Sequence, residues 1–132
     1  MLGLPCLAPP WGKLIAVDLK SSTILWEKPL GTIEELAPAI VPNFEFGTPN
    51  AGGSITTATG LTFIGAAMDH YIRAFDTQTG EKLWQHNLLR SGMATPMTYQ
   101  YEVRQYVVIA AGGHGGMGGK PGDFLVAFAL PK

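Results

Sequence analysis

Hydrophobic positions along this chain gather in short runs separated by polar and turn-forming residues. Each run is five to seven residues long and is rich in β-branched and aromatic side chains. Runs of this kind are typical of β-strands. The segments expected to be strands are Lys13–Asp18, Thr23–Lys28, Ser54–Ala58, Leu61–Gly65, Tyr71–Asp76, Lys82–Leu88, Thr95–Tyr99, Gln105–Ala111 and Phe124–Leu130.

The same pattern predicts no stable helix. The best helical candidate is Ile33–Ala39, but Pro38 and Pro42 cut it short, because proline removes a backbone donor and clashes with the preceding turn. The composition agrees, since 17 Gly and 10 Pro together make 27 of the 132 residues, and both residues disfavour helix interiors. We therefore expect an all-β chain.

A sequence repeat relates the expected strands to one another. Ala16-Val17-Asp18 is followed by Trp26, and Ala74-Phe75-Asp76 is followed by Trp84, with the same spacing in both copies. The two copies lie 58 residues apart, and a third copy begins at Phe124–Phe128. A repeat at such a period predicts an array of similar structural units.

Nine strands in this repeat fit a partial β-propeller best. A propeller blade has four antiparallel strands, so the strands divide into two of one blade, four of a second and three of a third. Residues 1–132 are then one incomplete domain of about two and a quarter blades. A last strand that is missing suggests the C-terminal part of a ring. Open blade faces and sheet edges predict poor folding or association of the isolated segment.

Charge and hydropathy exclude several other classes of protein. The net charge is −1 and the pI is about 6.3, and no Lys/Arg stripe is present, so a nucleic-acid partner is not expected. The hydrophobic content of 46% excludes a disordered chain. No run approaches the roughly 18 apolar residues of a membrane span. The single cysteine, Cys6, excludes an internal disulfide.

Antiparallel strands place the short turns on one face of the ring and the longer connections on the other. The longer connections are 30–53, 66–70, 89–94 and 112–123. Functional residues lie preferentially in loops on a rigid scaffold. Asp69 and His114 occupy the same connection in adjacent blades and could converge over one central pocket, so they are the candidate site residues.

Structural interpretations of these residues remain open. Asp69 could cap a turn, and the glycine-rich connection that carries His114 could be flexible and bind nothing. His70, at a strand entrance, favours a structural role. Gly113-x-Gly115-x-x-Gly118 matches a dinucleotide-binding pattern, but it leads into a strand instead of a helix, so we reject that interpretation. No cluster of His, Asp or Glu has metal-ligand spacing.

The repeat residues themselves are expected to be structural. Trp26 and Trp84 are large apolar side chains with one donor each, which suits packing between blades. Asp18 and Asp76 are expected to accept hydrogen bonds in turns.

These motifs resemble those of a known family. The segment Ala74–Trp84 resembles the tryptophan docking motif of quinoprotein dehydrogenases, eight-bladed propellers that carry pyrroloquinoline quinone (PQQ). Gly3–Gly12, Ala94–Tyr99 and Ala110–Gly115 resemble the C-terminal end of the membrane-bound glucose, quinate and shikimate branch. The likeness covers essentially the whole chain. One departure is Leu19–Ser22, which replaces the usual Thr-Gly turn.

The resemblance implies cofactor-binding roles for Asp69, which matches an acidic residue of the PQQ pocket, and for His114, which matches a pocket histidine of glucose-type members. It implies a fragment of an enzyme that oxidises an aldose or polyol hydroxyl. A carboxylate would act as general base, PQQ would accept the hydride and calcium would polarise the quinone. The catalytic carboxylate and the calcium ligands are expected outside these residues.

The resemblance also implies a cellular setting. Electrons would pass to ubiquinone, and the site would face the periplasm at the bacterial inner membrane. The isolated fragment is expected to be inactive. A non-catalytic propeller scaffold for protein–protein contact explains the tryptophans equally well, but it does not explain the glycine-rich connection or His114. A small sugar-binding module would need a closed domain.

Overall fold

The computed structural model describes residues 5–34, 36–37, 42–117 and 119–131. Within them the chain forms nine strands and one short 3-10 helix. The strands are β1 (Lys13–Asp18), β2 (Thr23–Pro29), β3 (Ser54–Thr56), β4 (Leu61–Ile64), β5 (Tyr71–Asp76), β6 (Lys82–Asn87), β7 (Met97–Tyr101), β8 (Arg104–Ala111) and β9 (Phe124–Phe128), and the 3-10 helix is η1 (Gly115–Met117).

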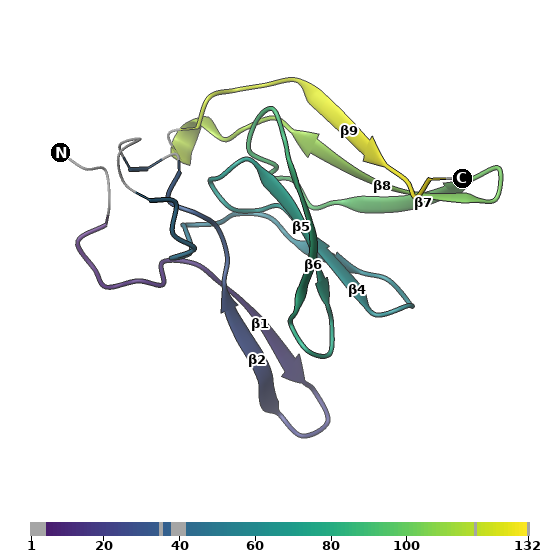
Figure 1. The fold of residues 1–132 in the computed structure, drawn as a ribbon, viewed down its shortest axis with the longest axis horizontal. Helices are drawn as coiled ribbons and strands as arrows, with labels where there is room; N and C mark the ends of the chain where they lie inside the picture. The colour runs from purple at the N-terminus through teal and green to yellow at the C-terminus, as the bar shows by residue number, and fades with distance from the viewer. Residues whose placement is uncertain (1–4, 35, 38–41, 118, 132) are drawn as a thin grey trace.

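The strands form three antiparallel sheets in chain order, β1-β2, β3-β4-β5-β6 and β7-β8-β9. This is the expected division of two, four and three strands. Figure 1 shows the sheets spreading from a region where the long connections gather, with the short turns at their far ends. Each sheet therefore has the strand order of a propeller blade, complete only in the second.

The repeat seen in the sequence is also a repeat of local geometry. Ala16 pairs with Trp26 across β1 and β2, and Ala74 pairs with Trp84 across β5 and β6. In both pairs of strands the register shifts directly after the alanine. A bulge at this position increases the local twist of the strands, so the two copies fold the same way.

One helix candidate and the bounds of several strands differ from expectation, most clearly at β3, β7 and β9. The described part of Ile33–Ala39 is a single turn, in which Leu36 and Ala37 donate to the carbonyl of Ile33; residues 35, 38 and 39 lie outside the described residues. β7 begins two residues later than expected because the Thr95 hydroxyl accepts the N–H of Gly53 in the neighbouring blade, while Pro96 has no N–H to pair.

The hairpin between β7 and β8 turns at Glu102 and Val103, which have φ of 45° and 56°. Two successive positive φ angles are those of a type I′ turn, which normally uses Asn or Gly. Without such residues the sequence did not indicate the turn, and the expected strand ended too early at Tyr99.

The hydrophobic core lies between adjacent sheets. One cluster joins Leu30, Ile64, Ala66, Ala67 and Phe75, with Leu14 of β1 packed against it. A second cluster joins Ile72, Leu88, Ile109 and Ala111, with Val107, Val126 and Phe128 at its edge. Because each cluster draws on two sheets, each blade is stabilised by burying apolar surface against its neighbour.

Trp26 docks onto the next blade as expected. Its indole Nε1 donates to the main-chain oxygen of Thr77 at 3.0 Å, across 51 residues of sequence. Gly80 lies beneath the ring, where a Cβ would come within 2.6 Å of the indole Cδ2. The glycine of the turn is therefore required both for its φ of +69° and for the close approach of the ring.

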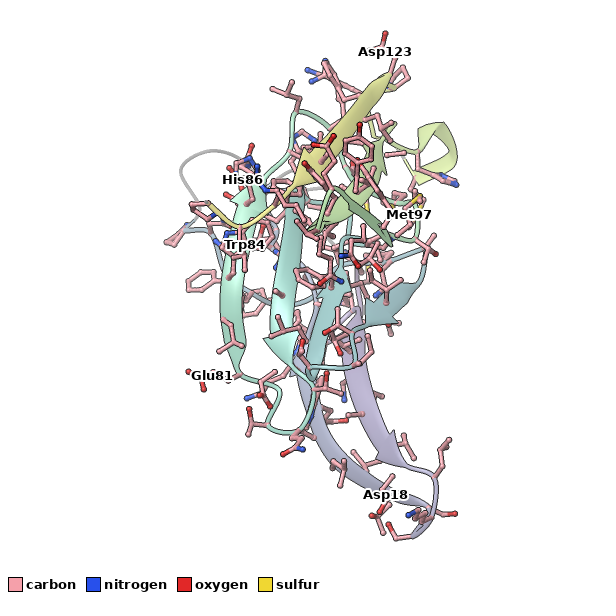
Figure 2. The ribbon with its side chains drawn as sticks, turned by 90° about the vertical axis from the view of Figure 1, so that its right-hand side faces the viewer. Asp18, Glu81, Trp84, His86, Met97 and Asp123 are labelled. Atoms are coloured by element: carbon pink, nitrogen blue, oxygen red, sulfur yellow. The ribbon has the colours of Figure 1, made fainter. Side chains whose placement is uncertain are left out.

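Trp84 also contacts the following blade, but less completely. Its ring lies edge-on to Phe128 at 5.1 Å and stacks with His86 at 6.1 Å. Figure 2 shows Trp84 and His86 together on β6, and both rings contact Phe128 of β9, the last strand of the third sheet. Trp84 remains 37% exposed. It lines a groove of about 810 Å³ between the second and third blades, together with Val103, Leu130 and other residues.

The two ends of the strands form opposite faces. In Figure 2, Asp18 and Glu81 lie in turns toward one end of the molecule, whereas Asp123, in the connection before β9, lies at the other end. This confirms that the short turns share one face and the long connections share the other. No helix among the described residues is long and apolar enough to cross a membrane.

Candidate functional site on the face of the long connections

The connection between β4 and β5 is held by the preceding blade. The Thr48 hydroxyl accepts the N–H of Met68 at 3.1 Å, and Asn50 forms an isolated bridge with Ala67. Gly31 lies so close to Thr48 that a Cβ would come within 2.4 Å of its hydroxyl oxygen. These contacts leave the segment 66–69 little freedom.

Asp69 lies at the end of this segment and is completely buried, with 0% exposure. Arg73 donates to both carboxylate oxygens, from Nη1 to Oδ1 at 3.1 Å and from Nη2 to Oδ2 at 2.5 Å. The N–H of Thr32 donates to Oδ2 at 2.7 Å. The N–H of Tyr71 makes a longer contact with Oδ1 at 3.4 Å. The turn-capping interpretation of Asp69 therefore describes part of what the carboxylate does.

Arg73 was not singled out by sequence reasoning. It lies in the middle of β5 and is 2% exposed, and its guanidinium carbon lies 5.2 Å from the centre of the Tyr71 ring. A signal was present, because a charged residue inside an apolar strand is almost never fully buried without a partner. The sequence did not identify which of the carboxylates was that partner.

A third connection, residues 88–92, joins the two candidate loops. The N–H of Leu88 donates to the oxygen of His70 at 2.5 Å, and the N–H of Gly113 donates to the oxygen of Ser91 at 3.0 Å. Gly92 accepts the N–H of Ala66 at 2.7 Å. The loop that carries Asp69 and the loop that carries His114 are therefore fixed to the same segment.

The glycine-rich connection is anchored at both ends. Gly122 donates to Gly112 at 2.9 Å, and Arg90 Nε donates to the oxygen of Pro121 at 3.2 Å. Gly113 has a φ of +67°, and a Cβ there would lie 2.1 Å from the oxygen of Lys120. Only glycine fits this crossing of the two ends. At Gly113 the absence of a side chain thus allows the two ends of this connection to approach each other closely.

His114 lies between these anchored ends, directly before η1. Its carbonyl accepts the N–H of Met117 at 3.0 Å, which closes the 3-10 turn. The residue is exposed, and its imidazole makes no hydrogen bond to any described residue. An exposed imidazole on a fixed backbone is available to a ligand on this face.

Asp69 and His114 thus occupy equivalent connections but differ in environment. The structure shows no direct contact between them, and they are linked through the 88–92 connection. Asp69 is buried and paired, whereas His114 is exposed and unpaired among the described residues. Within the described ranges no group of three His, Cys, Asp or Glu side chains lies together as a metal site would require.

The fold therefore defines a partial β-propeller with tryptophan docking between blades. The model of the PQQ glucose/ethanol/alcohol dehydrogenase β-propeller domain matches residues 1–107. Since this match covers most of the chain, the protein belongs to that family.

Curated relatives match nearly the whole chain. Quinoprotein glucose dehydrogenase A of Acinetobacter calcoaceticus is 51% identical over 132 residues, 98% of this chain. Quinoprotein glucose dehydrogenase of Escherichia coli is 49% identical over the same coverage, and the glycerol dehydrogenase large subunit of Gluconobacter thailandicus is 47% identical over 98% of this chain. The chain spans only 16%, 17% and 18% of the length of these relatives, respectively.

Solved structures support the same fold. The quinohemoprotein alcohol dehydrogenase from Comamonas testosteroni aligns with a TM-score of 0.60 at 29% identity, over 77% of this chain and 13% of that structure. A quinohemoprotein alcohol dehydrogenase from Pseudomonas putida aligns with a TM-score of 0.58 at 32% identity, over 77% of this chain and 12% of that structure.

The charge balance around Asp69 is compatible with an anionic cofactor on this face. The Asp69 carboxylate is neutralised by Arg73, so it does not present a free negative charge to the carboxylates of PQQ. The hydroxyl of Thr32 is buried without a hydrogen-bond partner among the described residues, and a Cβ on Gly115 would meet nothing within 4 Å. A buried polar atom without a partner is rare, and it marks the neighbourhood of Asp69 as a place where a polar ligand could bind.

Proposed function

We propose that residues 1–132 contribute one sector of the PQQ pocket in a quinoprotein dehydrogenase that oxidises a hydroxyl of an aldose or polyol, with glucose-type sugars preferred. The proposal is supported most directly by the identity of 51% and 49% to two quinoprotein glucose dehydrogenases. Two glycerol dehydrogenase large subunits are 47% and 46% identical, and two quinate dehydrogenases are 41% and 38% identical, beside 40% for the glucose dehydrogenase of Gluconobacter oxydans.

Asp69 and His114 are the cofactor-pocket residues of this proposal. His114 would contact the cofactor or the sugar through its exposed imidazole, and the anchored glycine-rich connection would hold it in place. Asp69 would act indirectly, because its carboxylate fixes the backbone of Thr32 and Tyr71 beside the pocket. PQQ, when bound, supplies the hydride-accepting carbonyl. The chain's own residues bind and orient.

The remaining parts of the proposal concern the parent enzyme. The catalytic carboxylate and the ligands of a calcium ion would come from other blades of the propeller. Ubiquinone would be the electron acceptor, at the periplasmic face of the inner membrane. Two relatives from the quinate branch are described as quinone-linked, which supports a quinone acceptor here.

A chimera tests this function. Residues 1–132 would replace the matching segment of the Escherichia coli quinoprotein glucose dehydrogenase, which is 49% identical over 132 residues. We expect the purified chimera to bind PQQ, seen as quenching of tryptophan fluorescence, and to oxidise glucose faster than quinate with a dye acceptor. A folded chimera that fails to bind PQQ would contradict the proposal.

His114→Asn in the chimera separates the role of the imidazole from the fold. We expect kcat/KM for glucose to fall by about tenfold to a hundredfold, as for loss of one positioned polar contact, with an unchanged melting temperature of the apoprotein. The matched control is His86→Asn, since the ring of His86 packs against Trp84 on β6 and against Phe128 of the third sheet (Figure 2). Equal losses in both variants would argue against a site role for His114.

A further inference from the structure

Arg73 and Asp69 form the most deeply buried ion pair among the described residues, with side-chain exposures of 3% and 0%. The planar guanidinium presents two parallel donors that match the two carboxylate oxygens. Removal of one partner from such a pair leaves an uncompensated charge in the protein interior. The pair therefore behaves as one unit, and neither residue can be understood without the other.

The carboxylate of Asp69 is turned toward its own scaffold. Arg73 occupies one direction at each oxygen, the Thr32 N–H occupies a second direction at Oδ2, and the longer Tyr71 contact lies at Oδ1. An acceptor that already receives these donors has little capacity left for a ligand. Asp69 is therefore better placed to orient the pocket than to hydrogen-bond to the cofactor.

The element that Asp69 orients belongs to another blade. Thr32 lies in the connection that follows β2, whereas Asp69 lies between β4 and β5. Their hydrogen bond at 2.7 Å ties these two connections together. The Thr48–Met68 contact at 3.1 Å is a second tie between the same connections. The relative position of the connections 30–53 and 66–70, called the rim below, thus depends on whether Arg73 keeps Asp69 in its present orientation.

The charge of Arg73 has an effect of its own. PQQ carries carboxylates, and an unpaired carboxylate beside them in a region of low dielectric would repel them strongly. With Arg73 in place the pair is neutral overall. The same arginine therefore fixes the geometry of the rim and removes a repulsion that would oppose cofactor binding.

We propose that Arg73 is a positioning residue of the cofactor site, acting through Asp69 and the Thr32 N–H without touching PQQ. The inference rests on the proposed function, because that proposal is what assigns PQQ to this face. The inference adds Arg73, which belongs to no sequence motif, to the residues of the site, and it gives Asp69 an indirect role.

The test measures PQQ affinity in the apo chimera by fluorescence titration, alongside the melting temperature of each apoprotein. Arg73→Met should raise the Kd for PQQ by at least about tenfold, because a buried carboxylate is left unpaired. Arg73→Lys should give an intermediate Kd, since an ammonium group is a point charge and cannot make the two-pronged contact. The double variant Asp69→Asn/Arg73→Met should bind PQQ more tightly than Arg73→Met alone, because the unpaired charge is gone.

A second ion pair provides the matched control. Glu45 and Lys82 also join the connection after β2 to the second sheet, but their side chains are 54% and 32% exposed. Lys82→Met should leave the Kd for PQQ within about twofold, because exposed pairs contribute little.

The outcomes separate this inference from the proposed function. An unsubstituted chimera that does not bind PQQ would contradict the proposed function. A chimera that binds PQQ, with Arg73→Lys and the double variant lowering the melting temperature but leaving the Kd unchanged, would show a purely structural pair and overturn the positioning role. Failure of Arg73→Met to fold leaves Arg73→Lys and the double variant to decide.

Discussion

At the scale of single residues, the turn aspartates show how this sequence fixes its strand connections. Asp76 Oδ1 accepts the N–H groups of Thr79 and Gln78 at 2.7 and 2.9 Å. Asp18 accepts the N–H of Lys20 at 2.9 Å. These bonds favour the charged form, so the N–H of Thr79 lowers the pKa of Asp76 and the N–H of Lys20 lowers the pKa of Asp18.

The lowered pKa of Asp76 predicts a pH dependence of stability with a definite sign. A carboxyl whose pKa is lower in the folded state stabilises the fold above its ordinary pKa of 3.8, and this contribution disappears as the pH falls through the lowered value. The difference in melting temperature between the unsubstituted chimera and Asp76→Ala should therefore be constant from pH 7 to about pH 5 and should shrink below about pH 4.

The control for this prediction is Asp76→Asn. The amide oxygen can still accept N–H groups, so we expect a smaller loss of stability than for Asp76→Ala. Neither variant titrates at this position, so the difference in melting temperature between them should not change with pH. A difference between the unsubstituted protein and Asp76→Ala that grows on acidification would contradict the assignment of the charged form to the turn.

Sequence reasoning identified residues that repeat and missed those that do not. Asp18, Asp76, Trp26 and Trp84 recur at a fixed spacing, so their structural roles could be predicted from pattern alone. Arg73 occurs once and acts through a partner four positions away. Its role depends on which side chains the fold brings together, and no local rule gives that information.

At the scale of elements, the joint between blades depends on one glycine. Gly80 has a φ of +69° and lies under the Trp26 ring. Gly60 also has a positive φ, of +84°, but a Cβ there would meet nothing within 4 Å. Both glycines therefore adopt a positive φ, but only Gly80 lacks space for a Cβ.

This pair of glycines yields a prediction. Gly60→Ala should destabilise the chimera by about 1 kcal/mol, the cost of a left-handed conformation for an alanine. Gly80→Ala should cost about 1–3 kcal/mol more, because the added methyl overpacks against the indole. Urea unfolding with tryptophan emission as the probe measures both. Equal costs would mean that the Trp26 contact does not contribute to the joint.

The order of the strands was predictable and their ends were less so. Alternation and turn residues, which are local properties, predicted all nine strands, and the sequence repeat predicted their division among three sheets. The start of β7 depends on a hydrogen bond between Gly53 and Thr95 of different blades. The hairpin at Glu102 and Val103 adopts positive φ without glycine. Both features are imposed by tertiary context over local preference.

At the scale of the whole molecule, the first and third sheets each lack a neighbouring sheet on one side among the described residues. On β1 and β2, Ile15, Val17, Ile24 and Leu25 are 46%, 48%, 61% and 56% exposed. On β9, Leu125 is 75% exposed. Apolar surface of this kind in contact with water is normally covered by another protein surface, which under the proposed function would be further blades.

Residues 1–132 expressed alone are therefore expected to self-associate. Sedimentation velocity should show species larger than 14.1 kDa whose size increases with concentration. Replacement of Ile24 and Leu25 by Lys should reduce the association, because it places charge on the open face. A monomer with a cooperative unfolding transition would show that neighbouring blades are not needed.

The connection formed by residues 88–92, which holds both candidate loops, constrains how mutation can alter this site. One segment holds both the loop of Asp69 and the loop of His114 through main-chain bonds. Under the proposed function, a substitution in this segment that moves its backbone would alter both the affinity for the prosthetic group and the specificity for the sugar. Natural variants that differ in substrate should then carry compensating changes in residues 88–92. Engineering of sugar specificity will have to monitor cofactor affinity as well.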